Sequence, residues 1–373
     1  MRVVVGMSGG VDSAVSAMLL KQQGHEVIGV FMKNWEEQDE GSLCTAESDW
    51  ADVRSTCDAL DIPYYAVNFS KEYLDRVFAL FLDEYKKGRT PNPDVLCNRE
   101  IKFKAFLDFA LKLDAQKIAT GHFVNTNAGG QLLKGADPGK EQSYFLYMLK
   151  AEQLKRSVFP VGHLLKSQVR ELARQYRLPI SEKKDSTGIC FIGERNFTNF
   201  LSAYLPAQPG LIKDTEGRTI GRHPGLMYYT LGQRKGLGIG GRGDGRSFFV
   251  VGKDLRANVL EVAQGADHPR LYSQGAKLEG LTWVGEPPCA PGETSCLNAK
   301  FRYRQPDQAV NLRWYGEEAE LEFLQPQRAV TPGQSAVIYR GDLCLGGGII
   351  QSVKAASANA AVSTLCLDTK WMK

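Results

Sequence analysis

The start of this chain combines a strand, a glycine loop and a helix within one short stretch. Residues 6–13 read Gly-Met-Ser-Gly-Gly-Val-Asp-Ser, directly after an apolar run and directly before an apolar-periodic helix. Glycines let a main chain approach a polyanion closely, and a helix N-terminus directs unpaired N–H groups at it. The loop lacks the Gly-Lys-Ser/Thr ending of a Walker A sequence. We therefore predict a phosphate-binding loop of another kind.

This loop resembles the PP-loop of the ATP pyrophosphatases, Ser-Gly-Gly-Xaa-Asp-Ser. The resemblance implies cleavage of ATP between its α and β phosphates and transfer of AMP to an oxygen, which then becomes a leaving group. The alternative interpretation is an ordinary glycine turn that opens a buried α/β unit. The full match in a strand–helix context argues against that alternative.

The N-terminal third of the chain alternates strand and helix patterns. The patterns predict strands at residues 2–5, 27–32, 64–67 and 117–120, and helices at residues 13–23, 50–60, 71–87 and 103–113. This order predicts an α/β fold with a doubly wound, Rossmann-like parallel sheet, in which ligands bind at the carboxyl ends of the strands. Gly6, Met32 and Gly121 lie at such ends.

The remaining sequence changes character after Pro206. Residues 150–205 are predicted to be helical, most clearly over 166–176, and the acidic stretch 36–49 is predicted to be a surface loop. Twelve glycines then fall between residues 209 and 256, and helical periodicity disappears. Short strands are predicted at residues 228–231, 248–251, 259–262, 301–304, 309–314, 319–323 and 335–339. We expect domains at 1–205, 206–271 and 272–354, the last a β-barrel, and a disordered tail at 355–373.

Composition narrows the function classes. No apolar run approaches the ~20 residues that span a membrane, and the chain opens as a core strand, so we expect no signal peptide, no membrane partner and a cytoplasmic location. The net charge is only +4, yet residues 209–256 hold nine Lys/Arg against four Asp/Glu. Such a basic stretch suits a nucleic-acid surface, although a solvated face is the commoner explanation.

None of the eight cysteines forms a Cys-Xaa-Xaa-Cys pair, which argues against a zinc knuckle. We expect free thiols, most of them small core residues. Cys97 lies in Thr-Pro-Asn-Pro-Asp-Val-Leu-Cys-Asn (90–98), a loop that two prolines stiffen between two helices, and Cys190 lies in Lys-Lys-Asp-Ser-Thr-Gly-Ile-Cys-Phe (183–191). Lys183 and Lys184 are expected to lower the pKa of the Cys190 thiol. Apolar packing explains these two positions poorly, so we predict chemical roles.

Several segments together resemble the bacterial tRNA-specific 2-thiouridylases, which place sulfur on C2 of the wobble uridine. Beyond the PP-loop and the two cysteine segments they are Ala-Thr-Gly-His (119–122), Gln-Ser-Tyr-Phe-Leu (142–146) and Tyr-Thr-Leu-Gly-Gln-Arg-Lys-Gly-Leu-Gly-Ile-Gly-Gly (229–241). One departure is Glu141, where the family has aspartate between the lysine and the glutamine. The similarity runs to about residue 348 and leaves the tail from about residue 355 unmatched.

The resemblance implies a role for each matching position. Cys190 carries the incoming sulfur as a persulfide, Cys97 is the second catalytic thiol, a transient Cys97–Cys190 disulfide forms, and Asp94 transfers a proton. Asp12 is the implied Mg²⁺ ligand. ATP is bound by Gly6, Met7, Ser8, Gly9, Gly10, Val11, Asp12, Ser13, Met32 and Gly121. The target base is bound by Asn92, Pro93 and Asp94. tRNA is contacted by His122, Lys140, Glu141, Gln142, Arg302, Tyr303 and Gln334.

The resemblance also implies cofactors and partners. ATP and Mg²⁺ are the cofactors, and the sulfur comes from a sulfur-relay donor protein as a persulfide. The central and C-terminal domains bind tRNA, and the implied substrates are the tRNAs for Lys, Glu and Gln. We expect a monomer. His122 has a second interpretation, since a histidine at a strand end can simply satisfy backbone groups.

Three alternatives remain open from the residues. A PP-loop synthetase or amidotransferase acting on a small molecule explains the ATP loop but not the paired thiols. A non-catalytic RNA-binding protein that retains the fold has no need of Asp94, Cys97 and Cys190 together. An iron–sulfur cluster on those same three residues is chemically feasible. We favour the persulfide route, because no local cysteine pair is present to seed a cluster.

Overall fold

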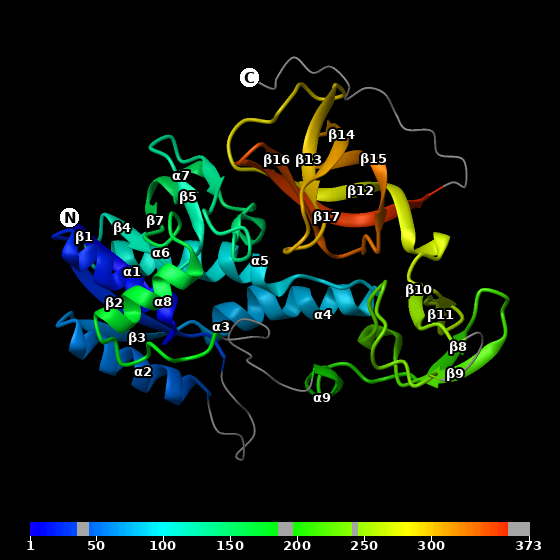
Figure 1. Cartoon of the computed structure of the whole chain (residues 1–373), viewed down its shortest axis with the longest axis horizontal. Coiled ribbons are helices and arrows are strands. Elements are labelled where there is room, and N and C mark those ends of the chain that lie inside the picture. Colours follow the sequence, from blue (N-terminus) through cyan, green and yellow to red (C-terminus); the bar gives the residue numbers. More distant parts are fainter. Residues whose placement is uncertain (36–44, 186–196, 241–244, 357–373) are drawn as a thin grey trace.

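A computed structural model describes residues 1–35, 45–185, 197–240 and 245–356. Its N-terminal part is built on a five-stranded parallel sheet of order β3-β2-β1-β4-β7 (Figure 1). The strands are β1 (Arg2–Met7), β2 (Glu26–Lys33), β3 (Tyr64–Asn68), β4 (Lys117–Ala119) and β7 (Ser157–Val158). The chain leaves β1 toward β2 on one side and returns to β4 on the other, so β1 lies at the topological switch point. The predicted doubly wound sheet is confirmed.

Helices cover both faces of this sheet because successive residues of β1 point to opposite sides. Val3 and Val5 belong to one apolar core and Val4 to the other. The first core is closed by α1 (Val11–Gln22), α2 (Thr45–Ala59) and α8 (Lys166–Gln175). The acidic stretch predicted as a loop is therefore helical from Thr45, and residues 36–44 lie outside the described part of the chain.

Two long helical stretches cover the other face, and each has a π-helical middle. The first is α3 (Ser70–Tyr73), η1 (Leu74–Phe78) and α4 (Ala79–Lys86). The second is α5 (Pro93–Cys97), η2 (Asn98–Ala105) and α6 (Phe106–Leu111). The second stretch was predicted to begin at residue 103. It begins at Pro93 instead, because proline fits the first turn of a helix, where its missing N–H needs no partner.

The later parts of the chain are β-rich, as predicted. A four-stranded sheet has the order β10-β11-β8-β9 and follows α9 (Phe197–Ser202). Its strands are β8 (Gly210–Lys213), β9 (Thr219–His223), β10 (Phe248–Asp254) and β11 (Val259–Gln264). Six further strands close into a barrel through the β12–β17 pairing. They are β12 (Tyr272–Trp283), β13 (Thr294–Lys300), β14 (Gln308–Tyr315), β15 (Glu318–Arg328), β16 (Ser335–Arg340) and β17 (Leu343–Ala355).

Two predicted strands are wrong. Residues 228–231 begin in a 3₁₀ turn, η4 (Leu226–Tyr228), and the Thr230 N–H donates to the Gln233 side chain instead of a neighbouring strand. Residues 301–304 form the turn that ends β13, in which the Gln305 N–H donates to the Arg302 carbonyl at 3.1 Å. Aromatic residues gave both segments a strand-like composition, but local turn hydrogen bonds determine their structure.

A short hairpin from the N-terminal part joins the barrel. Strand β6 (Leu132–Lys134) pairs with β17 through Leu133–Leu343 and Leu132–Cys344, and β5 (Val124–Thr126) completes the hairpin. Neither strand was predicted, nor was β7, which follows α7 (Ala151–Lys155) within the region expected to be helical. One apolar core continues from the sheet into the barrel and includes Tyr339 and Cys344. The N-terminal part and the barrel are therefore held together by a common apolar core.

The cysteines follow the expectation in part. Cys57, Cys97 and Cys344 are buried free thiols, and Cys289 is a half-buried one. Cys296 is disulfide-bonded, contrary to the expectation of free thiols throughout. Cys44, Cys190 and Cys366 lie outside the described residues. Across the described part of the chain, no helix has the length and apolar character that crossing a membrane requires.

Candidate active site

The PP-loop joins β1 to α1 at the switch point of the sheet. Gly9 has a φ of 73°, in the left-handed region that favours glycine, and Gly10 is the extended residue before the helix. The Ser13 hydroxyl donates to the Gly10 carbonyl at 2.9 Å and accepts the Ser8 N–H at 3.2 Å. Among the described residues, no side chain caps the start of α1. The loop is thus closed by its own serine, and the helix N-terminus is open to an anion.

Neighbouring elements approach this loop closely. A Cβ added to Gly121, just after β4, would lie 2.7 Å from the Asp12 carbonyl carbon and 2.8 Å from the Ser13 nitrogen. A Cβ on Gly9 would lie 2.7 Å from the Asp49 carbonyl oxygen. Met32 is buried beneath the loop, its Cε 3.1 Å from the Cβ position of Gly6. The fold therefore brings the predicted nucleotide residues of three strand ends together.

A network of charged side chains lies beside the loop. The Asp12 carboxylate receives the Lys166 ammonium at 2.5 Å, and Lys166 also contacts Asp185 at 2.8 Å. Arg170 and Lys140 reach Asp185 as well, at 2.6 Å and 2.7 Å. Burial raises the pKa of the Asp12 carboxyl, although the nearby Lys166 ammonium acts to lower it. Although burial opposes ionisation, hydrogen bonds from Lys140 and Lys166 lower the pKa of Asp185 to about 2.

Sequence reasoning missed Lys166, Arg170 and Asp185. A signal for each was available, since the two basic residues begin the predicted helix at 166–176 and Asp185 lies in one of the segments that carry the family resemblance. Because these residues lie far from Asp12 in the sequence, their position beside it could not be predicted. Only the fold shows that they meet next to Asp12.

The predicted magnesium ligand can be tested for fit. Among the described residues, no group of three or more His, Cys, Asp or Glu side chains is placed to hold a metal ion. Mg²⁺ usually takes one or two carboxylates together with phosphate oxygens and water. Asp12 fits the role of a single carboxylate ligand that shares the ion with a bound triphosphate.

The segment of residues 90–98 is held from both later domains. The Thr90 N–H donates to the Pro332 carbonyl at 3.0 Å, and the Gln334 side-chain amide donates to the carbonyls of Thr90 and Pro91 at 2.7 Å and 3.3 Å. The hydroxyls of Thr90 and Thr230 lie 3.3 Å apart. Gln334, predicted to touch tRNA, here fixes the main chain that leads to Asn92, Pro93 and Asp94.

Cys97 is fully buried at the end of α5. It belongs to the large apolar core, and burial raises the pKa of its thiol to about 12, with Lys102 acting in the opposite direction. The expectation that apolar packing explains Cys97 poorly is wrong, because helix α5 turns this residue inward. Asp94, in the first turn of the same helix, is half-buried. Cys190 lies outside the described residues, so the predicted pairing of the two thiols remains a prediction.

His122 follows β4 and is held by a short-range contact. Its Nδ1 lies 2.8 Å from the Thr120 hydroxyl, and its ring lies 5.9 Å from that of Phe103 between centroids. Burial lowers the pKa of His122 well below its ordinary value, so the imidazole is neutral at physiological pH. Its predicted contact with RNA is a prediction still.

The residues predicted to touch tRNA near position 141 hold the turn between the domains. Glu141 is 5% exposed and pairs with the buried Lys300 at 3.0 Å. The Gln142 side chain accepts the Phe123 N–H at 3.0 Å. The Tyr303 hydroxyl donates to the Lys140 carbonyl at 3.1 Å.

Arg302 lies nearby, where it donates to the carbonyls of Leu231 and Ala329 at 3.2 Å and 3.0 Å. Through these bonds it connects the barrel to the central domain. Its predicted contact with tRNA, like those of residues 140–142 and Tyr303, stays a prediction.

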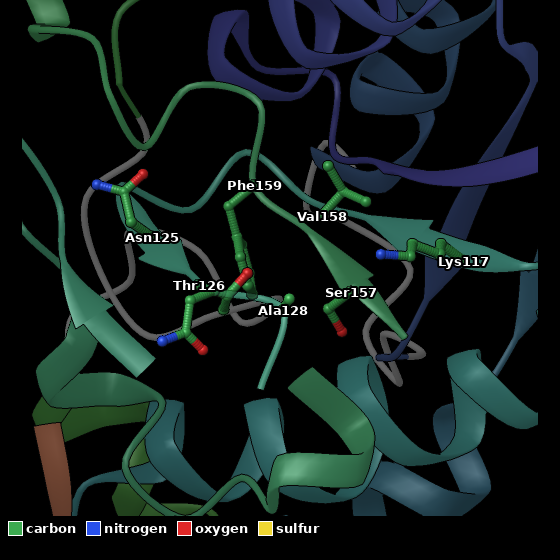
Figure 2. Close-up of a pocket in the computed structure, with 8 residues that line it drawn as sticks. Lys117, Asn125, Thr126, Ala128, Ser157, Val158 and Phe159 are labelled. Carbon is green, nitrogen blue, oxygen red and sulfur yellow. The ribbon is translucent and has the colours of Figure 1, made fainter. Parts of the chain in front are cut away.

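A cavity of about 280 Å³ opens elsewhere in the N-terminal part, at the edge of the sheet formed by β4 and β7 (Figure 2). It contains none of the predicted site residues. Its lining is formed by Lys117, Asn125, Thr126, Asn127, Ala128, Ser157, Val158 and Phe159. Lys117 stands at the start of β4, whereas the PP-loop follows the carboxyl end of β1. The candidate active site therefore consists of the PP-loop and its neighbours, and this cavity is not part of it.

The fold and the loop define a PP-loop protein of the HUP type, and comparison with known proteins agrees. Residues 1–194 match the family model "tRNA methyl transferase HUP domain". Residues 198–264 match "tRNA methyl transferase PRC-barrel domain", and residues 273–350 match "Aminomethyltransferase beta-barrel domain".

Similarity to curated proteins extends over nearly the whole chain. The tRNA-specific 2-thiouridylase MnmA of Alkaliphilus oremlandii is 57% identical over 358 residues, covering 94% of this chain and 97% of that protein. Another relative, MnmA 1 of Geobacillus kaustophilus, is 57% identical over 367 residues, covering 97% and 98%. The chain belongs to the tRNA-specific 2-thiouridylase family, a family of sulfurtransferase enzymes that modify tRNA.

Proposed function

We propose that this protein thiolates C2 of the wobble uridine of tRNA at the expense of ATP. The C2 oxygen is first adenylated, and a cysteine persulfide then delivers sulfur, so that 2-thiouridine, AMP and pyrophosphate are formed. The observation that carries the proposal is the open PP-loop at the switch point of the sheet, with Gly121 and Met32 packed against it, in a chain 57% identical to proteins named for this activity.

Adenylation solves a leaving-group problem. The C2 oxygen of uracil departs poorly, whereas AMP departs readily once it is attached there. The PP-loop would supply main-chain N–H groups and the Ser8 hydroxyl to the phosphates, while Ser13, whose hydroxyl donates to the Gly10 carbonyl, holds the loop in shape. The bound triphosphate would then be positioned for attack by the C2 oxygen. Bound Mg²⁺ would neutralise phosphate charge, with Asp12 as its protein ligand.

Sulfur delivery requires two thiols. The terminal sulfur of a Cys190 persulfide attacks C2 and AMP leaves, so the base becomes linked to Cys190 through two sulfur atoms. The Cys97 thiol then attacks the Cys190 sulfur, which releases the thiocarbonyl and leaves a Cys97–Cys190 disulfide for a cellular thiol to reduce. A bound persulfide competes well with water, which would only regenerate uridine. Asp94, three residues before Cys97, is the proposed proton acceptor.

The substrate must present an unstacked base. A wobble uridine lies in the anticodon loop, where flipping is less costly than in a duplex. The segment 92–94 would receive it. His122, residues 140–142, Arg302, Tyr303 and Gln334 would line the path of the RNA, with the basic stretch 209–256 holding phosphates. The substrates are proposed to be the tRNAs for Lys, Glu and Gln, the sulfur donor a relay protein, and the enzyme a cytoplasmic monomer.

Reconstitution tests the proposal. Purified protein, ATP, Mg²⁺, a persulfide donor and unmodified tRNA should yield 2-thiouridine, measured by mass spectrometry of tRNA nucleosides. Cys97→Ser and Cys190→Ser should each abolish the product, while Cys289→Ser, a half-buried thiol in the barrel, should retain activity and serves as the control. Full activity of Cys190→Ser would defeat the persulfide assignment. ATP–pyrophosphate exchange driven by a metabolite in place of tRNA would favour a small-molecule synthetase.

A further inference from the structure

Three cations converge on a single carboxylate beside the PP-loop. One oxygen of Asp185 accepts from Lys166 at 2.8 Å and from Arg170 at 2.6 Å, and its other oxygen accepts from Lys140 at 2.7 Å. The side chains of the three cations are only 16% to 26% exposed. Like charges this close repel one another strongly, so the arrangement requires an anion at its centre.

The cations come from elements that are fixed independently of Asp185. Lys166 and Arg170 lie one turn apart at the start of α8, and the Lys166 N–H donates to Asp137 at 2.8 Å. Lys140 belongs to the turn that begins at Asp137, and its carbonyl accepts the Tyr303 hydroxyl. The cationic site therefore has its own scaffold, and Asp185 enters it from a separate segment.

This cationic site adjoins the loop that binds phosphate. Lys166 bridges the carboxylates of Asp12 and Asp185, so Asp185 lies one side chain away from the start of α1. Two residues before Asp185, Lys183 bonds Asp49 at 2.7 Å and Asp52 at 2.5 Å on α2. Asp49 is also the residue whose main chain contacts Gly9. The segment that contains Lys183 and Asp185 is thus attached both to α2, beside the PP-loop, and to α8.

Three donors around two oxygens suit a phosphate group better than a carboxylate. A terminal phosphate presents three anionic oxygens and more charge, and both Lys and Arg are common phosphate ligands. Asp185 is also held by these cations in its ionised form, because hydrogen bonds from Lys140 and Lys166 stabilise the carboxylate. The Asp185 carboxylate thus accepts from the same donors as a phosphate would and has the same sign of charge, but it has less charge than a phosphate.

We propose that Lys140, Lys166 and Arg170 bind the terminal phosphates of the nucleotide, and that Asp185 occupies their site as an intramolecular competitor until ATP displaces it. The inference rests on the proposed use of ATP and adds the residues that recognise the leaving pyrophosphate. Because the competitor is tethered, the apparent ATP affinity is reduced by the fraction of molecules in which Asp185 fills the site. Displacement also breaks the ion pairs of Asp185 with Lys140, Lys166 and Arg170. The bond from Arg170 to the Lys183 carbonyl and the Glu182–Arg174 ion pair still attach the segment to α8.

Asp185→Asn tests the competition in the full chain without tRNA. Calorimetric titration should show ATP and inorganic pyrophosphate binding about tenfold more tightly than to the parent protein, because the competing charge is gone. AMP, which lacks the terminal phosphates, should bind within about twofold of the parent. Glu182→Gln is the matched control, because the exposed Glu182–Arg174 ion pair joins the same segment to the same helix without facing the PP-loop network.

Arg170→Gln tests the site independently of Asp185. It should weaken ATP and pyrophosphate about tenfold and leave AMP unchanged. Thermal unfolding shows whether Asp185→Asn is folded. If it is not, Arg170→Gln alone tests whether the three cations bind the terminal phosphates. Unchanged or weaker ATP binding by folded Asp185→Asn, or equal losses for ATP and AMP in Arg170→Gln, would overturn the inference while leaving the thiolation proposal intact. Absence of ATP binding by the parent chain would defeat both.

Discussion

The PP-loop and the segment 90–98 both carry predicted site residues, yet they are held in opposite ways. The PP-loop is closed by a hydrogen bond between neighbours, from Ser13 to Gly10. The segment 90–98 is fixed from afar, by Pro332 and Gln334 of the barrel and Thr230 of the central domain. The conformation of the PP-loop is therefore specified largely by local sequence, whereas the target-base segment requires the whole molecule to be folded.

The largest expected effect concerns the reactivity of Cys97. Burial raises the pKa of this thiol to about 12, so its thiolate fraction near pH 8 is on the order of 1000-fold below that of an ordinary thiol. Alkylation by iodoacetamide, followed by mass spectrometry of peptides, should label half-buried Cys289 first and Cys97 far more slowly. Equal rates would show that the segment 90–98 is not held in place, and the contrast between the two regions would fail.

Gly121→Ala should damage the nucleotide site alone. The added Cβ meets main-chain atoms of Asp12 and Ser13, which cannot rotate away, so we expect ATP to bind about 100-fold more weakly. Gly285→Ala is the control, because a Cβ there meets nothing within 4 Å. Isothermal titration with ATP measures the effect, and wild-type affinity in Gly121→Ala would contradict the close packing of β4 on the loop.

Gln334→Ala should damage the other region alone. Loss of its bonds to the Thr90 and Pro91 carbonyls frees the main chain before Asn92, and thiolation in a single turnover should slow about tenfold. ATP affinity should stay within about twofold of the parent. Gln308→Ala is the control, because its side chain bonds the nearby Pro306 carbonyl and, among the described residues, has no bond to the segment 90–98. Reduced ATP affinity in Gln334→Ala would mean that the two regions are coupled.

The last expected effect is a pH dependence of stability at the junction with the central domain. Lys253 donates to the Gly88 carbonyl at 3.1 Å, and burial lowers its pKa to about 8. Between pH 8 and about 10.4, the usual pKa of lysine, the unfolded chain holds more protons than the folded one, so stability should rise with pH across this window. Thermal unfolding of the parent and of Lys253→Met measures it, and the variant should lack the rise. A rise of the same size in Lys253→Met would assign it to other groups.

The sequence predicted the parallel sheet well because its signals are local. Buried strands such as β1 and β2 are continuous apolar runs, and Gly9 and Gly10 mark the turn between strand and helix. Pairings between distant segments left no such signal. The β5–β6 hairpin is short and pairs with a strand far along the chain, so no periodicity could have revealed it.

The candidate site shows the same division. The PP-loop residues could be read directly, whereas the environment of Cys97 was misjudged because its polar neighbours in sequence do not predict which way a helix turns a side chain. The convergence of Lys140, Lys166 and Arg170 on Asp185 was likewise invisible, because each residue is unremarkable by itself. Such sites depend on tertiary contacts that a single sequence does not encode locally.

The pairing of the β5–β6 hairpin with β17 determines how this protein can be divided into fragments. A fragment that stops before the barrel would leave the outer edge of β6 without its partner, and exposed strand edges invite association with other chains. The barrel alone would lose the same edge and part of the apolar core around Cys344. We therefore expect fragments separated at the linker to aggregate and to be poorly soluble when they are produced alone. Co-expression of the two fragments is the better route to a split enzyme.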